Sequence, residues 1–159
     1  MKNIITLLML SAVCLVNAQA FKGKGDIKVQ VGGNFQSGAS GIHLCADFGI
    51  GENMSYGFTG AYLLSENTSM LDFKDRVDLR ARFNANIGKV LTLPDNVDVY
   101  PGLDLGMKNF GAHLGVRYFF SEGFGLYSEA GFPIAKYDKD QLINTHNQFN
   151  FNIGVSFNL

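Results

Sequence analysis

Apolar and polar residues alternate along most of the chain, from about residue 27 to its last residue. The pattern is plainest at the C-terminus, in NQFNFNIGVSFNL, where an apolar residue stands at every second position from Phe149 to Leu159. A period of two is the signal of a β-strand whose two faces meet different surroundings. No stretch after residue 20 keeps the 3.6-residue period of a helix. The sequence therefore predicts an all-β protein.

The alternation recurs in eight segments of roughly ten residues each. They cover residues 27–35, 42–50, 56–64, 77–87, 97–105, 110–120, 124–132 and 149–159. Tilted strands of about 9 to 11 residues match the hydrocarbon thickness of a bilayer. Two connections that follow odd-numbered strands, residues 64–76 and 134–148, are long and polar, whereas those after even strands are mostly tight. This arrangement is typical of outer-membrane barrels, so we predict an eight-stranded antiparallel up-and-down transmembrane β-barrel.

The polar face distinguishes a membrane barrel from a soluble barrel, because both kinds alternate. In DLRARFNANIG the polar positions carry Asp, Arg and Asn, and elsewhere they are mainly Gly, Ser and Asn with a few ions. A water-exposed exterior would be dense in Lys and Glu, yet only 17% of the residues are charged. We expect the polar face inside and the apolar face against lipid. A soluble exported barrel that binds a small apolar ligand is the alternative.

Ionic residues of both signs fall on the predicted inner face. They are Asp26, Lys28, Asp47, Asp78, Arg80, Arg82, Asp98, Asp104, Arg117 and Glu129. Eight strands enclose only enough space for their own side chains, which favours a lumen plugged by a network of ion pairs. A pore with a charged selectivity lining is the alternative. The alternation does not tell which pairs meet.

Proline interrupts the fifth predicted strand in the sequence DVYPGLDLG. Proline donates no ladder hydrogen bond, and a closed barrel has no free edge where that loss is harmless. We expect a local break at Pro101, with a bulge at Gly102.

Residues 1–20 have the features of a cleaved signal peptide. Lys2 precedes an apolar run over residues 4–16, and the small-x-small sequence AQA ends at Ala20. The run is shorter than the ~20 apolar residues of a spanning helix. We expect cleavage after Ala20, which leaves residues 21–159 as a single barrel domain.

Composition and candidate chemistry exclude several classes of function. The net charge is −1 without a Lys/Arg-rich stripe, which argues against nucleic-acid binding. His43 and His113 fall on the inner face, His146 lies in the last long loop, and no Ser–His–acid triad is recognisable. The acidic pair in YDKDQ lacks the ligand set of a calcium loop. We therefore expect no enzyme activity, no metal site and no cofactor; a lipid-modifying barrel enzyme is the alternative.

The last eight residues, NIGVSFNL, fit the polar-x-Gly-x-x-Φ-x-Φ pattern shared by outer-membrane barrels. Asn152, Gly154, Phe157 and Leu159 hold its fixed positions, although a final Phe is commoner than Leu. With KGDIKVQVGGNFQ, FKDRVDLRARFNANIG, VDVYPGLDLGMKNFGAHLGVRYFF and FGLYSEAGFPIAKYD, the chain resembles small outer-membrane barrels of the OmpA transmembrane domain and OmpX type. It looks closest to a family of short barrels whose function is uncharacterised.

The resemblance implies a location in the outer membrane of a Gram-negative bacterium, surrounded by outer-membrane lipid. It also implies insertion by the barrel assembly machinery, which would recognise the C-terminal strand. We expect a non-enzymatic integral membrane protein whose loops 64–76 and 134–148 present a surface for adhesion or envelope interaction with an extracellular partner.

Overall fold

The computed structural model describes residues 18–64, 72–137 and 145–159. Most of the predicted signal peptide and the middle of both predicted long loops lie outside these described residues. The strands are β1 (Ile27–Gln36), β2 (Ala39–Gly49), β3 (Met54–Leu63), β4 (Val77–Ala85), β5 (Val97–Gly106), β6 (Asn109–Phe119), β7 (Phe124–Lys136) and β8 (Asn150–Asn158). One short helix, α2 (Phe73–Arg76), precedes β4. No helix in the described part of the chain is long and apolar enough to cross a membrane.

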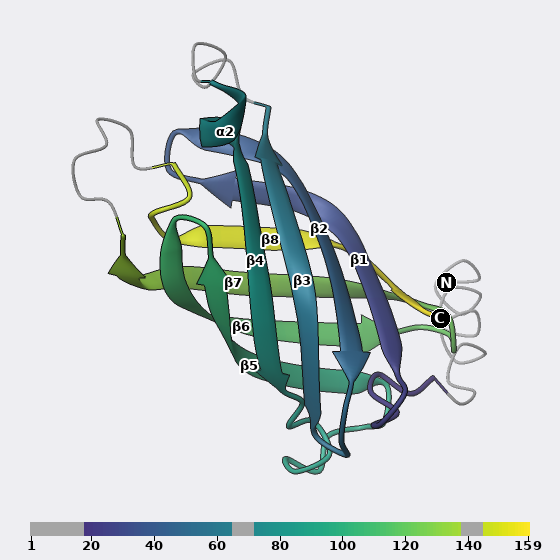
Figure 1. Ribbon diagram of the computed structural model, residues 1–159. Coiled ribbons are helices and arrows are strands. Elements are labelled where there is room, and N and C mark those ends of the chain that lie inside the picture. Colours follow the sequence, from purple (N-terminus) through teal and green to yellow (C-terminus); the bar gives the residue numbers. More distant parts are fainter. Residues whose placement is uncertain (1–17, 65–71, 138–144) are drawn as a thin grey trace, which may run out of the picture.

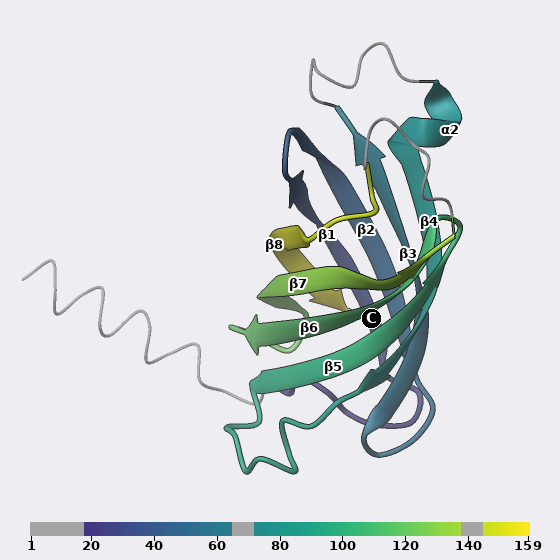
Figure 2. The same ribbon diagram turned by 90° about the vertical axis from the view of Figure 1, so that its left-hand side faces the viewer.

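The strands form a closed antiparallel barrel in sequence order, as Figures 1 and 2 show. β8 pairs with β1 along its whole length, from Gln36↔Asn150 to Lys28↔Asn158. The seam gives the last strand a partner on both sides, so its backbone groups are hydrogen-bonded although the strand is apolar. The predicted all-β, eight-stranded antiparallel barrel is confirmed. We call the end where β1 begins and β8 ends the terminal end, and the opposite end the loop end.

The two faces of the sheet have opposite chemistry, as the alternation predicts. Outward positions carry large apolar side chains that are well exposed, such as Phe58 (60%) and Leu105 (61%). Inward positions carry polar side chains that are fully buried, such as Gln30, Asn84 and Ser156. Side chains of a strand alternate between the two faces. A shift of one residue in the pairing of a strand would therefore turn its apolar side chains inward and its polar side chains outward, so this pattern fixes the register of the barrel.

The bulge expected at Pro101 is absent, and that prediction is wrong. β5 pairs with β6 without a register shift. The Val99 carbonyl accepts a hydrogen bond from Ile87 N–H, on the β4 side. Backbone groups in a strand point alternately to the two neighbours, so the Pro101 nitrogen also faces β4. The β4–β5 ladder begins only at Gly102; proline therefore removes no hydrogen bond from the β5–β6 ladder.

A register shift occurs instead beside another proline, between β6 and β7. Phe110 pairs with Ala135 while the next residue, Gly111, pairs with Pro133, so Ile134 is the extra residue of β7. A bulge of this kind strengthens the local twist. It lies at the loop end, where β7 runs on to Lys136.

Candidate functional site

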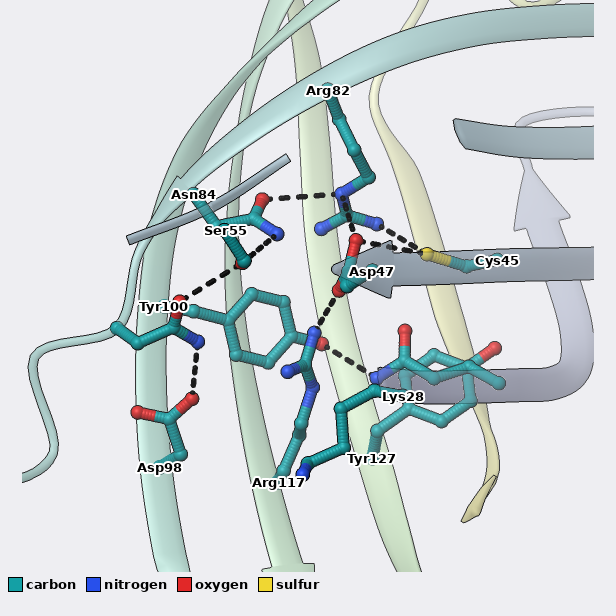
Figure 3. A network of polar contacts seen from close by, with 12 residues as sticks. Lys28, Cys45, Asp47, Ser55, Arg82, Asn84, Asp98, Tyr100, Arg117 and Tyr127 are labelled. Atoms are coloured by element: carbon teal, nitrogen blue, oxygen red, sulfur yellow. Dashed lines mark hydrogen bonds and ion pairs between the residues drawn. The ribbon is translucent and has the colours of Figure 1, made fainter. Parts of the chain in front are cut away.

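The waist of the lumen is filled by charged and aromatic side chains from different strands (Figure 3). Arg82 Nη2 donates to Glu129 Oε2 at 2.7 Å. Arg82 Nε lies 3.5 Å from Asp47 Oδ1, a contact drawn in Figure 3. Arg117 forms a close ion pair with the other oxygen of Asp47. The Tyr100 ring lies beside both guanidinium groups, 5.7 Å from that of Arg82 and 3.9 Å from that of Arg117. These side chains form one connected polar cluster, which we call the waist network.

Glycine makes room for the large inward side chains of this network. Tyr100 pairs with Gly115 across β5 and β6, and an added Cβ at Gly115 would overlap the Tyr100 ring. Tyr127 pairs with Gly154 across β7 and β8, and its hydroxyl oxygen would lie 2.7 Å from a Cβ added at Gly32. A barrel of this width takes its two largest inward rings only opposite residues without a side chain.

The terminal end of the lumen holds a second ionic group. Lys28 Nζ lies 2.5 Å from Asp26 and 3.0 Å from Asn158 Oδ1, and it lies over the Phe119 ring. Asp98 accepts hydrogen bonds from the Asn86 amide at 2.7 Å and from a backbone N–H. The hydrogen-bond donors to Asp98 are thus neutral groups.

The remaining predicted lumen ions lie toward the loop end. Arg80 pairs with Asp78 at 2.5 Å. Asp104 lies 2.9 Å from His113 Nδ1, and His113 Nε2 lies 2.6 Å from Arg82 Nη2. All the predicted ionic residues therefore line the lumen, and each of the three predicted inward arginines has a carboxylate partner.

A small polar cavity of about 20 Å³ separates the waist network from the loop end. Its lining includes His43, Asp78, Arg80 and Asp104, and His146 lies over it from the segment before β8. The sequence indicates no role for His146, because its position in a polar loop carries no periodic signal. The tertiary structure alone brings it over the lumen.

The three histidines have hydrogen-bond partners inside the barrel. His43 Nδ1 lies 2.8 Å from Tyr127 Oη and its Nε2 lies 2.7 Å from Thr59 Oγ1. His113 contacts Asp104, and His146 contacts a backbone carbonyl. Among the described residues, no three His, Cys, Asp or Glu side chains are grouped so that they could hold a metal ion.

The residues of the C-terminal pattern occupy four different positions around the seam. Asn152 points inward and binds Asn34, Gly154 pairs with Gly32, and Phe157 packs outward near Phe124. The backbone N–H of the last residue, Leu159, donates to Ile27 at 3.0 Å. Recognition of this pattern by the assembly machinery stays a prediction.

Phe157→Asp is expected to block assembly in cells much more than Phe151→Asp. Both side chains lie on the outer face of β8 with nearly equal exposure, 38% and 39%, so the cost of placing a charge outside is similar. Only Phe157 holds a fixed position of the C-terminal pattern. The amount of folded barrel in membranes measures the difference; equal insertion of the two variants would remove the assignment.

Comparisons with known proteins relate this geometry to other barrels. The fold is similar to the N-terminal β-barrel domain of Pseudomonas aeruginosa OprF, with a TM-score of 0.62 and 11% identity over 87% of this chain and 100% of that chain. It is also similar to a structure from the de novo design of transmembrane β-barrels, with a TM-score of 0.55 and 11% identity over 87% of this chain and 98% of that chain. No curated protein matches. The family model described as "Family of unknown function (DUF6646)" matches residues 11–159, and the chain belongs to that family.

Proposed function

We propose that this chain is a non-enzymatic integral protein of the bacterial outer membrane, with a plugged lumen and a loop-end surface that contacts other components of the envelope. The apolar outer face of the closed sheet carries the proposal. Every strand contributes large exposed apolar side chains to it; examples are Val31, Leu44, Phe58, Leu79, Leu103, Leu114, Leu126 and Ile153. Exposure to water would cost roughly 25 cal/mol per Å² of this surface, whereas acyl chains would cover it without that cost.

Aromatic rings at the terminal end support a bilayer as the surroundings. Phe48 stacks on Tyr56 at 5.4 Å, and Phe124 contacts Phe120 and Phe157 at 6.3 and 5.8 Å. These pairs join neighbouring strands on the outer face. A band of aromatic side chains near the membrane–water boundary is typical of transmembrane barrels.

The plugged lumen is supported by the waist network and by the segment that precedes β1. Arg82, Tyr100 and Arg117 are buried across the middle of the barrel. Phe21, the first residue of the predicted mature chain, is buried at the terminal end beside Asn86 and Asp98. The histidines also face inward and are buried, so the described part of the chain presents no imidazole to lipid for a lipid-modifying reaction.

The loop end offers an apolar surface beyond the barrel wall. Phe73 of α2 is 72% exposed, and Met107 and Tyr137 are exposed at neighbouring connections. Phe73 also packs against Tyr62, which carries Arg76 over its ring. Exposed aromatic and apolar groups of this kind favour contact with an envelope or extracellular partner. The middle parts of loops 64–76 and 134–148 lie outside the described residues.

Cell fractionation tests the proposal. We expect the mature protein to remain with the outer membrane, to require detergent for extraction, and to migrate differently on gels with and without boiling. The closed hydrogen-bonded barrel resists unfolding by detergent at room temperature and loses its compact shape on heating. Recovery as a soluble periplasmic protein would contradict this result and favour a soluble ligand-binding barrel.

The same purified protein tests the plugged lumen in a planar bilayer. We expect only small and irregular currents, because side chains of the waist network fill the cross-section. A large, steady, ion-selective conductance would overturn the plugged lumen and support a pore. Altered lipid A or phospholipid in cells that lack the protein would instead support the lipid-modifying enzyme.

A further inference from the structure

Residues 145–148 form a closure across the loop end of the lumen. Thr145, His146 and Asn147 are buried although they belong to a loop. The His146 carbonyl accepts hydrogen bonds from Arg80 Nη2 at 3.2 Å and from Asn109 Nδ2 at 2.8 Å. Through these contacts the segment joins β4 and β6 above the polar cavity.

His146 connects the same segment to β1 and α2. The His146 backbone N–H donates to Gln36 Oε1 at 2.9 Å, and the ring Nδ1 lies 3.2 Å from Gln36 Nε2. On the other side of the ring, Nε2 lies 3.1 Å from the Arg76 carbonyl oxygen. His146 is thus the residue at which four parts of the loop end meet.

A chain of side-chain amides fixes the direction of these hydrogen bonds. It starts at Glu129, whose carboxylate can only accept, so the Asn152 amide nitrogen must point to it at 3.3 Å. Asn152 Oδ1 then accepts from Asn34 at 2.7 Å, and Asn34 Oδ1 accepts from Gln36 Nε2 at 2.7 Å. The Gln36 amide nitrogen is therefore a donor, and its second hydrogen points to His146.

This orientation specifies one neutral form of the His146 ring. Nδ1 must be unprotonated to accept from Gln36, and Nε2 must carry the proton that is donated to the Arg76 carbonyl. A proton on Nδ1 would face the amide hydrogens of Gln36. A flip of that amide would break its bonds to Asn34 and to the His146 backbone, so the protonated ring has no place in this arrangement.

We propose that His146 is an acid-sensitive latch: the neutral ring holds residues 145–148 across the loop end, and protonation of Nδ1 releases them and opens the polar cavity. The latch rests on the amide chain and the buried segment, and it does not depend on the proposed role of the loops. The latch controls access to the part of the lumen between the loop end and the waist network, and the waist network itself stays closed.

The charges around the ring agree with this behaviour. Burial is the largest effect and lowers the pKa of His146 from 6.5 to about 4. Asp78 of β4 and the Arg76 carbonyl of α2 favour the charged ring, whereas Lys108 of the β5–β6 connection and Arg80 of β4 oppose it.

The sign of the pH effect follows from the lowered pKa. Above pH 6.5 the ring is neutral in both the closed and the released segment, and closure is at its strongest. As the pH falls from 6.5 to about 4, the released ring takes up a proton while the latched ring does not. The closure equilibrium weakens through this window, and below it the loss reaches roughly 300-fold, the ratio that corresponds to the pKa difference.

Nuclear magnetic resonance of the mature chain in detergent micelles tests the latch. The ring signals of His146 are expected to titrate with a midpoint near pH 4. The backbone amides of residues 145–148 and the Gln36 side-chain amide should change with the same midpoint, while strand amides at the waist stay unchanged. Carboxylates titrate in the same range, so variants must identify the group responsible.

His146→Asn should abolish the coupled response. Asn tolerates the left-handed backbone at this position (φ 62°), and its oxygen can accept from Gln36 but cannot become charged. Gln36→Glu should raise the midpoint of the His146 titration by roughly 1 to 3 pH units, because a carboxylate stabilises the protonated ring. His43→Gln removes a different buried histidine and should leave the response as in the wild type.

Three results would overturn the latch. The first is titration of His146 near pH 6.5 without any change in residues 145–148. The second is an unchanged pH response in His146→Asn, which would assign the change to carboxylates. The third is an unchanged midpoint in Gln36→Glu, a variant that also keeps the test valid should His146→Asn fail to fold.

Discussion

Arg82→Met is expected to lower the free energy of unfolding in detergent by about 3 to 5 kcal/mol, the cost of leaving a buried charge without its partner. The Arg82 side chain has no exposed surface and contacts two carboxylates, those of Asp47 and Glu129. Methionine fills a similar volume and donates no hydrogen bond, so Glu129 loses the guanidinium that lies 2.7 Å away. The chain contains no Trp; denaturant unfolding is best followed by circular dichroism or by gel mobility without boiling.

Arg80→Met is the matched control for this prediction. Arg80 also pairs with a carboxylate, Asp78, but its side chain keeps 11% exposure and lies near the loop end. Asp78 itself is buried, but Arg80 contacts this one carboxylate, whereas Arg82 contacts two, so the loss should be smaller. Adding Glu129→Gln to Arg82→Met should recover part of the stability. Equal effects of the two arginine variants, or no recovery in the double variant, would show that the waist network is hydrated and weakly coupled.

Gly154→Val is expected to prevent most of the chain from closing into a barrel. An added Cβ at Gly154 would overlap the Val31 carbonyl oxygen and the Gly32 Cα atom. These are backbone atoms of β1, so they cannot move aside without opening the seam between β1 and β8. Overpacking alone costs about 1 to 3 kcal/mol, and the loss of seam hydrogen bonds adds to it.

Gly60→Val in β3 is the control, because an added Cβ there first meets the end of the Leu79 side chain, at 3.2 Å. The compact fraction after refolding in detergent should be near that of the wild type for Gly60→Val and much smaller for Gly154→Val. Refolding in detergent involves no assembly machinery. A Gly154→Val protein that refolds normally in detergent but fails to insert in cells would make Gly154 part of the recognition signal and contradict the steric explanation.

The strands and their faces could be predicted because alternation is a local property. A run such as Phe151, Ile153 and Val155 needs only its own sequence to show which side meets the apolar surroundings. The inward position of Arg82 and Asp47 follows in the same way. Their contact does not follow, because it depends on how far each strand is shifted along its neighbours.

Pro101 shows a second limit of local reasoning. The sequence shows that a donor is missing from the fifth strand, but not which neighbour that position faces. In the structure the Pro101 nitrogen faces β4. The β4–β5 ladder begins one residue later, at Gly102. The cost of the proline depends on pairing that no local pattern encodes, and the predicted bulge was wrong for that reason.

The strand order of an up-and-down barrel, the apolar outer face and the set of ions inside could all be predicted, since they follow from alternation and from connections between consecutive strands. The folded barrel was needed to show that Asp47 contacts both Arg82 and Arg117, and that His146 lies over the lumen against Gln36. Residues 36 and 146 are distant in the chain and meet because β8 closes on β1. Such contacts arise from the closure and stagger of the whole barrel, which bring together side chains that share no local pattern.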